Sequence, residues 1–238
     1  MLFRSVKAAR AAGSIINRAA LDVAAVRVSQ KQSNDFVTEV DHASEEAIID
    51  TLLTAYPDHG IRAEESGTTR GNADSDHVWI IDPLDGTTNF IHGMPQYAVS
   101  IALMHREVLT HGVIYDTAKN ELFHASRGAG AFLNDRRIRV SKRSRFGDAL
   151  IGTGSPYTNE RELERYLAMY RAVISQVAAV RRPGAAAIDL AWVAAGRFDG
   201  VWELGLSPWD IAAGALLIQR SEEHTSELQS LRHLVCRL

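Results

Sequence analysis

The chain has 238 residues, 46% hydrophobic and 23% charged, with a formal net charge of −3, which is ordinary for a globular protein with a full core. No apolar run approaches the ~18 residues of a membrane span, the N-terminus lacks the apolar block of a signal peptide, and no Lys/Arg run or basic stripe marks a nucleic-acid footprint. The only cysteine is Cys236, which excludes an internal disulfide, so we expect a cytoplasmic protein.

The first half of the chain predicts two helices followed by a group of strands. Apolar residues at helical spacing predict helices over 2–21 and from about 39 to 56, joined by a polar connection at 31–35. A short strand at 60–63 and a bulky apolar strand at 78–81, buried on both faces, come next. An antiparallel meander is then predicted over residues 98–104, 108–115, 121–125 and 131–133.

The second half alternates between strands and helices. The predicted elements are a strand at 149–154, a helix at 160–178, a strand end at 180–181, a helix at 184–195, a strand at 198–204 and a helix opened by Pro208. No linker or internal repeat divides the chain. Alternating sheets and helices predict an α/β protein of stacked layers.

Two acids stand at the carboxyl end of the bulky strand. Pro83 lies between Asp82 and Asp85 and keeps the backbone extended at Asp82. Gly86 permits a conformation that a side chain would block, and the two threonines after it are good caps for a short helix with free backbone N–H groups. Carboxylates for a hard cation beside amides for an anion predict a site for metal and phosphate. An acidic β-turn is the alternative for Asp-Pro-x-Asp-Gly taken alone.

Further acids fall at the ends of other predicted elements. Glu64 follows the strand at 60–63 and Asp210 opens the last helix, so four carboxylates converge with Asp82 and Asp85 at one edge of a sheet. Such a group repels itself unless cations lie among its members, and oxygen ligands favour Mg²⁺ or Mn²⁺ over zinc. Taken alone, Glu64 also suits a solvated strand end, and the spacing of Asp41 favours an ordinary helix N-terminal acid.

Four separated motifs resemble the inositol monophosphatase family. They are Asn34-Asp-Phe-Val-Thr with Asp41, Ala63-Glu-Glu-Ser-Gly67, Trp79-Ile-Ile-Asp-Pro-Leu-Asp-Gly-Thr-Thr-Asn-Phe90, and Trp209-Asp-Ile-Ala-Ala-Gly214. The third is the family's signature for lithium-sensitive phosphatases. The resemblance covers about residues 3–219 and implies one α/β (α+β layered) domain over 1–219, an αβαβα sandwich like that of inositol monophosphatase and fructose-1,6-bisphosphatase.

The resemblance also implies a catalytic apparatus. Two Mg²⁺ ions, with a weaker third, would be held by Glu64, Asp82, the Leu84 carbonyl, Asp85 and Asp210. Glu64 and Thr87 would orient a water for in-line attack on phosphorus, with Asp41 supporting Thr87. The positions that match the family's substrate contacts are Asp85, Gly86, Thr87, Gly184, Ala185, Ala186, Glu203 and Asp210. Ala185 replaces the Ser or Thr common in the family, which removes one hydroxyl contact.

The expected activity is hydrolysis of myo-inositol monophosphates or similar small polyol phosphates. Fructose bisphosphate, adenosine bisphosphate and histidinol phosphate are alternative substrates within the superfamily. A different class of function is also implied, because bacterial relatives act as non-catalytic partners of ribosomal RNA transcription complexes. The family further suggests a homodimer.

Residues 220–238 differ in their interpretation from the rest of the chain. The run from Arg220 to Ser230 is identical to what a common short-read sequencing adapter encodes in frame. We therefore expect 220–238 to be a non-native tail joined to a truncated gene, with a genuine amphipathic tail as the alternative.

Overall fold

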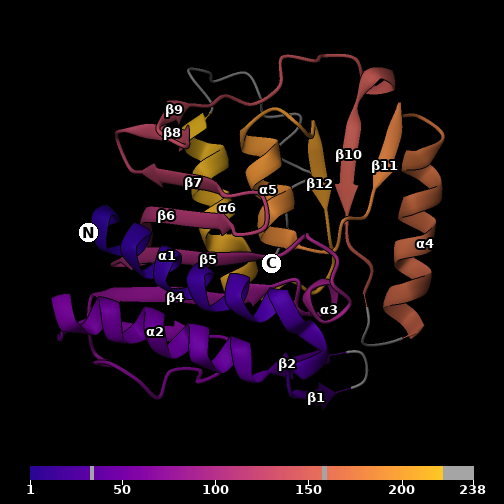
Figure 1. Cartoon of the computed structure of the whole chain (residues 1–238). Coiled ribbons are helices and arrows are strands. Elements are labelled where there is room, and N and C mark those ends of the chain that lie inside the picture. Colours follow the sequence, from indigo (N-terminus) through magenta and orange to yellow (C-terminus); the bar gives the residue numbers. More distant parts are fainter. Residues whose placement is uncertain (33–34, 157–159, 222–238) are drawn as a thin grey trace.

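The computed structural model describes residues 1–32, 35–156 and 160–221, with a seven-stranded sheet at its centre (Figure 1). β3 runs parallel to β4, and every later neighbouring pair is antiparallel, so the predicted meander is confirmed. In sheet order the strands are β3 (Gly60–Ala63), β4 (His77–Asp85), β5 (Ala98–His105), β6 (Val108–Asp116), β7 (Glu121–Ser126), β8 (Gly130–Leu133) and β9 (Arg136–Arg137).

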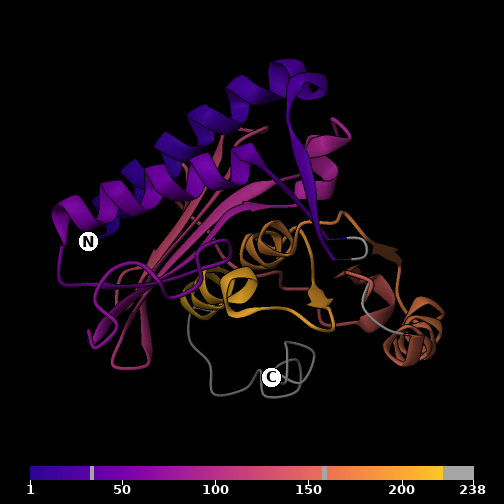
Figure 2. The same ribbon diagram turned by 90° about the horizontal axis from the view of Figure 1, so that it is seen from below.

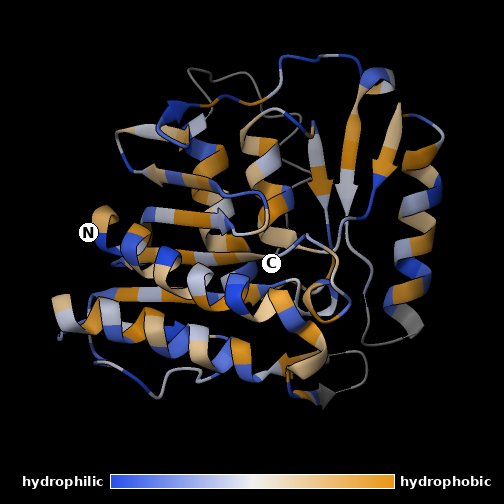
Figure 3. Cartoon of the chain, in the orientation of Figure 1, coloured by the Kyte–Doolittle hydropathy of each residue, from blue (hydrophilic) through white to orange (hydrophobic). Residues whose placement is uncertain are grey.

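The central strand β4 is buried on both faces, as predicted. Successive side chains of a strand point to opposite faces, so Trp79 and Ile81 enter one core cluster and Ile80 enters another. The first cluster packs beneath α1 (Leu2–Ala19) and α2 (Glu39–Ala55). The second packs against α5 (Ala186–Ala194) and α6 (Pro208–Ser221). Figure 3 shows α1 and α2 with both apolar and polar stretches, as expected for helices with one covered side.

A second, smaller sheet lies beyond α5 and α6. Its three parallel strands are β11 (Ala179–Arg181), β10 (Leu150–Thr153) and β12 (Gly200–Trp202), in that order. Val201 packs with residues of α5, whereas Ile151 and Trp202 pack with Tyr166 of α4 (Glu160–Ile174). The layers therefore run α1/α2, large sheet, α5/α6, small sheet, α4, as Figure 2 shows from below. The predicted αβαβα sandwich is confirmed.

Several local expectations were wrong. Residues 31–32 and 35 of the expected polar connection instead belong to the antiparallel hairpin strands β1 (Val28–Gln32) and β2 (Asp35–Thr38). These strands are too short for an alternation of polar and apolar residues to reveal them. The helix predicted to reach 178 ends at Ile174, and the strand predicted over 198–204 is confined to β12. Three short helices complete the fold: η1 (Ala20–Ala25), α3 (Thr87–Ile91) and η2 (Phe146–Asp148).

The two threonines expected to cap α3 do not cap it. Gly86 is the N-cap, with φ of 89°, and Thr87 is the first helical residue. Glycine reaches this left-handed conformation without the steric cost that a Cβ imposes. Within the described ranges, no helix combines the length and apolar character needed to cross a bilayer. The prediction for 220–238 falls outside these ranges, except for Arg220 and Ser221 at the end of α6.

Candidate active site

The strand-end acids gather at one edge of the large sheet. β3 and β4 are parallel, with Ala63 beside Ile81, so Glu64, the residue directly after β3, lies beside Asp82 of β4. α6 delivers Asp210 to the same edge, because the hydroxyl of Ser100, which pairs with Asp82 across β4 and β5, donates to the Trp209 carbonyl at 3.1 Å.

An irregularity in β4 turns Asp82 and Asp85 toward one place. Residues three apart in a regular strand point to opposite faces. The pairing of β4 with β5 shifts register between Asp82 and Asp85, at Pro83, which cannot donate a ladder hydrogen bond. This bulge re-aims the second carboxylate, so each aspartate lies within electrostatic reach of Asp210.

These acids are close enough to raise one another's pKa values. Burial raises the pKa of Asp82 well above its ordinary value, and repulsion from Glu64, Asp85 and Asp210 raises it further. Burial, followed by repulsion from Asp210, does the same to the pKa of Asp85. The pKa of Asp210 rises to about 7, first through burial and also through the Glu64 charge. Glu64, Asp82, Asp85 and Asp210 therefore lie within electrostatic reach of one another.

One backbone N–H group holds an oxygen of each aspartate. The N–H of Leu84 lies 3.0 Å from Asp82 Oδ1, and that of Ala187 lies 2.7 Å from Asp85 Oδ2. The N–H of Ser207 lies 2.6 Å from Asp210 Oδ2. Each bond uses one carboxylate oxygen and fixes the side chain, so the second oxygen of each group remains as a potential ligand.

The acids are near one another but are not gathered as ligands of a single ion. Among residues 1–32, 35–156 and 160–221, no three His, Cys, Asp or Glu side chains are arranged so that they could hold a metal. The aspartates face three different backbone donors, and like charges favour such separation. The donor set nonetheless fits a hard divalent cation in its chemistry, because the buried Asp82, the half-buried Glu64, Asp85 and Asp210 and the Leu84 carbonyl offer the oxygen ligands that Mg²⁺ prefers.

Thr87 and Asp41 form a separate hydrogen-bonded unit beside the acids. Thr87 Oγ1 lies 2.9 Å from Asp41 Oδ1 and 3.0 Å from the Leu84 carbonyl oxygen. Asp41 Oδ2 accepts from both the backbone N–H and the hydroxyl of Thr38, at 2.8 and 2.6 Å. The interpretation of Asp41 as an ordinary helix N-terminal acid is thus correct, and the same carboxylate also reaches Thr87.

The residues predicted to contact the alcohol lie across from β4. Gly184, Ala185 and Ala186 form the turn into α5, with Ala185 as the N-cap and only 2% exposed. Glu203 follows β12, and burial followed by repulsion from Asp210 raises its pKa to about 7. Asp85, a predicted metal ligand, accepts from the N–H of Ala187, the residue directly after the predicted alcohol contacts Gly184–Ala186.

Sequence reasoning missed two acids near this site. Glu45, 4% exposed on α2, accepts from the N–H groups of Glu65 and Ser66, both at 2.9 Å, and so holds the turn that carries Glu64. Its spacing of four from Asp41 places it on the same helix face, which is a signal that the sequence does contain. Asp189 on α5 is 1% exposed, and burial followed by repulsion from Glu203 and Asp85 raises its pKa to about 9.

The fold and this arrangement of acids define a phosphatase-like scaffold, and comparisons with known proteins agree. The chain belongs to the inositol monophosphatase family, whose model matches residues 1–220. The Nus factor SuhB of Pseudomonas aeruginosa is 50% identical over 224 residues, which are 93% of this chain and 83% of that protein. The inositol-1-monophosphatase of Mesorhizobium japonicum is 47% identical over 223 residues, 94% of this chain and 84% of its own.

Solved structures extend the likeness to three dimensions. The crystal structure of the extragenic suppressor protein suhB from Bartonella henselae superposes with a TM-score of 0.88 at 46% identity, covering 92% of this chain and 83% of that one. An IMPase/NADP phosphatase complexed with Mg²⁺ and phosphate is 26% identical with a TM-score of 0.75, covering 87% of this chain and 77% of its own. A relative of the same fold therefore binds Mg²⁺, the kind of cation that this donor set suits, together with phosphate.

Proposed function

We propose that the chain is a Mg²⁺-dependent phosphomonoesterase that hydrolyses myo-inositol monophosphates or similar small polyol phosphates. The observation that carries this proposal is the group of mutually repelling carboxylates around the buried Asp82, beside the Thr87–Asp41 unit. The charged groups that shift the pKa of Asp82 are all acids, namely Glu64, Asp85 and Asp210. Such a group suits metal-assisted attack on a phosphate ester.

Thr87 and Glu64 are the residues proposed to position the attacking water. The Thr87 hydroxyl donates its proton within the protein, toward Asp41 or the Leu84 carbonyl, so its lone pairs remain to accept a hydrogen bond from water. Asp41 is fixed by Thr38, which keeps the Thr87 hydroxyl in one orientation. Glu64 would accept the second proton of that water and serve as general base.

Glu64, Asp82, Leu84, Asp85 and Asp210 are the proposed ligands of two or three Mg²⁺ ions. When bound, the cations would lower the pKa of a water and offset the negative charge of the phosphoryl oxygens. The backbone N–H groups of Gly86 and Thr87 would hold phosphate oxygens. Asp85, Asp210, Glu203 and the turn Gly184–Ala186 would hold the hydroxyls of the alcohol.

Phosphate release from inositol 1-phosphate, with and without Mg²⁺, tests the proposal. We expect Mg²⁺-dependent turnover by the full chain, and a loss of about 100-fold or more in Asp82→Asn, because a ligand shared by two ions is removed. Asp74→Asn, at an exposed site away from the acids, is the control and should retain activity. Near-normal turnover by Asp82→Asn with Mg²⁺ would contradict the metal assignment.

The identity of the alcohol needs a second measurement. Fructose bisphosphate, adenosine bisphosphate and histidinol phosphate should be compared with inositol 1-phosphate by kcat/KM. A preference of at least about tenfold for the inositol ester supports the proposed substrate. A larger kcat/KM for one of the other three would keep the reaction and replace the substrate.

We propose a second function, in which the chain is a partner of transcription complexes, because several of its relatives are Nus factors. A basic strap, residues 136–145, supports this function. It carries six exposed Lys and Arg side chains: Arg136, Arg137, Arg139, Lys142, Arg143 and Arg145. In the sequence this segment does not stand out as a basic run, because Ile138, Val140, Ser141 and Ser144 interrupt it. The strap leads toward the amino end of β10, whereas Glu203 follows the carboxyl end of the parallel strand β12. The strap and the candidate site therefore lie at opposite ends of the strands of the small sheet (Figure 1).

Retention of RNA polymerase from a bacterial lysate by the immobilised chain, detected with a specific antibody, tests this second function. We expect Asp82→Asn to retain the polymerase and Arg136→Gln/Lys142→Gln to retain less, because fewer cations face the partner. Arg4→Gln/Lys7→Gln makes the same charge change on α1 and is the matched control. Equal retention by the two double variants would remove the strap from the interface.

We further propose a cytoplasmic homodimer with one inositol monophosphatase-like domain over residues 1–219, a range that the family match supports. Sedimentation equilibrium of the purified chain should give twice the mass of the 26.1 kDa protomer. A single species of protomer mass would contradict the dimer.

A further inference from the structure

Two polar residues of the signature motif, Thr88 and Asn89, are not used by the proposed chemistry, and Asn89 is the one whose side chain reaches a distant segment. It lies on α3, and its Nδ2 is 2.8 Å from the carbonyl oxygen of Gln96, 2.9 Å from that of Pro183 and 3.1 Å from that of Gly184. All three acceptors are carbonyl groups, so the side chain can only donate to them. Asn89 thus links α3 to Pro183 and Gly184, which lie more than ninety residues later in the chain.

The contact with Gly184 is close and specific. Gly184 has φ of 87°, and a Cβ there would lie 3.1 Å from Nδ2 of Asn89 and 3.4 Å from Oδ1. Glycine is therefore required both by the backbone and by the approach of the amide. On the other side of the junction, a Cβ on Gly86 would lie 3.3 Å from Cβ of Ala185, so the two turns touch without an intervening side chain.

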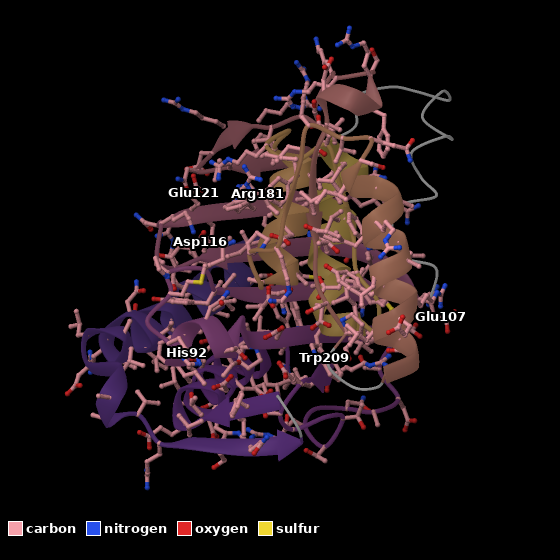
Figure 4. The ribbon with its side chains drawn as sticks, turned by 90° about the vertical axis from the view of Figure 1, so that its right-hand side faces the viewer. His92, Glu107, Asp116, Glu121, Arg181 and Trp209 are labelled. Atoms are coloured by element: carbon pink, nitrogen blue, oxygen red, sulfur yellow. The ribbon has the colours of Figure 1, made fainter. Side chains whose placement is uncertain are left out.

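Gln96, whose carbonyl accepts from Asn89, is anchored to the large sheet. Lys119 Nζ donates to Oε1 of Gln96 at 2.9 Å, to the Pro95 carbonyl at 3.0 Å and to Oδ2 of the fully buried Asp116 at 2.9 Å. Asp116 ends β6 beside the start of β7 at Glu121, and both are labelled in Figure 4. The Gln96 carbonyl is therefore a fixed reference, and the amide of Asn89 ties the Gly184 turn to it.

We propose that Asn89 is a positioning residue that sets the separation between the turn Gly86–Thr87 and the turn Gly184–Ala186. This inference rests on the proposed phosphatase function, in which the first turn holds the phosphate and the second the alcohol. Asp85 makes the other link, through the N–H of Ala187, but that carboxylate is also a proposed metal ligand. Asn89 is uncharged, so its link is independent of metal and substrate charge.

Loss of the Asn89 amide should release the second turn and leave the first intact. The bonds of Thr87 to Asp41 and to Leu84 do not involve Asn89. We therefore expect weaker recognition of the alcohol with an undisturbed water-positioning unit. In kinetic terms, KM for a polyol phosphate should rise more than kcat falls.

Amide hydrogen exchange of the full chain tests the link without any turnover. In Asn89→Ala the amides of residues 184–187 should exchange about tenfold faster than in the unsubstituted chain, as expected for the loss of one net hydrogen bond. Thr88→Ala, a neighbouring exposed position on α3, is the matched control and should leave them unchanged. Unchanged exchange in Asn89→Ala would overturn the proposal.

Two substrates separate positioning from a general loss of stability. For Asn89→Ala we expect kcat/KM to fall about tenfold with inositol 1-phosphate and less than about twofold with p-nitrophenyl phosphate, whose leaving group has no hydroxyls to bind. Asn89→Asp keeps the shape but removes the donor, so it should behave like Asn89→Ala. Equal losses on both substrates, or a normal Asn89→Asp, would overturn the proposal. If the unsubstituted chain hydrolysed neither ester, the phosphatase function would fail, while the exchange result would still decide the link.

Discussion

Glu203 lies directly over the Cα atom of Gly154. A Cβ added at Gly154 would collide with the Glu203 carboxylate, although the backbone conformation of this glycine does not require the absence of a side chain. Glycine is thus needed at position 154 because the side chain of Glu203, a proposed substrate contact, occupies the place of a Cβ. In the sequence, the pair Gly152 and Gly154 resembles a simple turn, because nothing in the local pattern shows what approaches it.

Gly154→Ala should therefore displace Glu203. We expect KM for inositol 1-phosphate to rise and kcat/KM to fall about tenfold, since one hydrogen-bonding carboxylate moves out of place. Gly147→Ala, where the nearest atom to an added Cβ is 3.9 Å away, is the control and should have no effect.

A double substitution shows whether Gly154 acts through Glu203. If it does, Gly154→Ala added to Glu203→Ala should cost nothing further in kcat/KM. Additive losses would mean that the glycine supports the site in another way.

Two helices begin with the acids that the site uses. Thr38 and Asp41 form a complete capping box at the start of α2, and Asp210 accepts from the N–H of Ser207 at the start of α6. Each cap bond uses one carboxylate oxygen and orients the acid toward the edge of the sheet. A carboxylate has two oxygens, so each of these acids can cap its helix with one oxygen and keep the other for the proposed site.

The turn after β3 depends on Glu45 of α2. Replacing it by Gln would leave the N–H of Glu65 or Ser66 facing an amide N–H, and an unsatisfied buried donor costs about 1–3 kcal/mol. We expect Glu45→Gln to lower the melting temperature by about 2–4 °C per kcal/mol lost and to reduce Mg²⁺-dependent turnover, since Glu64 is carried by this turn. Glu46→Gln, the exposed neighbour near Arg70, is the control; an equal effect from it would discount the role of Glu45.

Elements with strong periodicity could be predicted from the sequence, and short ones could not. The apolar run at 78–81 and the antiparallel meander follow from side-chain spacing alone. The hairpin of β1 and β2 and the Gly86 cap depend on tertiary contacts or on a positive φ that no pattern reveals. Among site residues, the acids of the motifs were predicted, whereas Glu45, Asn89 and Asp189 were missed because their partners lie about 20 to 100 residues away or in another layer.

The site draws on most layers of the molecule. β4 supplies Asp82 and Asp85, α2 supplies Asp41 from one face of the large sheet, and α6 supplies Asp210 from the other. Glu203 comes from the end of the small sheet. The arrangement of acids thus exists only when the layers are packed together, so assembly of the site is coupled to global folding.

A ring stack far from these acids links that global fold to pH. Tyr56, His59, His77 and His105 stack in succession, with ring centroids 4.9, 4.7 and 4.1 Å apart. They connect the end of α2 with β4 and β5. Burial, followed by the nearby His77, lowers the pKa of His59, while Asp58 opposes the shift. The ion pair of Asp76 with Arg106 flanks the stack.

The sign of the pH effect follows from the lowered pKa of His59. Its contribution to stability is complete above the unfolded pKa of 6.5 and is lost as the pH falls through the lower folded value, because the unfolded chain then binds more protons. Between pH 7.5 and 5.5 the contribution of His59 to the free energy of unfolding should therefore decrease, by at most about 1.4 kcal/mol per pH unit, whereas the raised pKa values of Asp210 and Glu203 act in the opposite direction. A comparison of variants isolates the histidine: His59→Phe keeps a stacking ring without the titration, so its free energy of unfolding at pH 5.5, relative to pH 7.5, should be higher than that of the unsubstituted chain. His92→Phe, at an exposed position labelled in Figure 4, should change with pH as the unsubstituted chain does. Urea unfolding at both pH values measures the difference, and parallel changes in all three proteins would show that the stack does not sense pH.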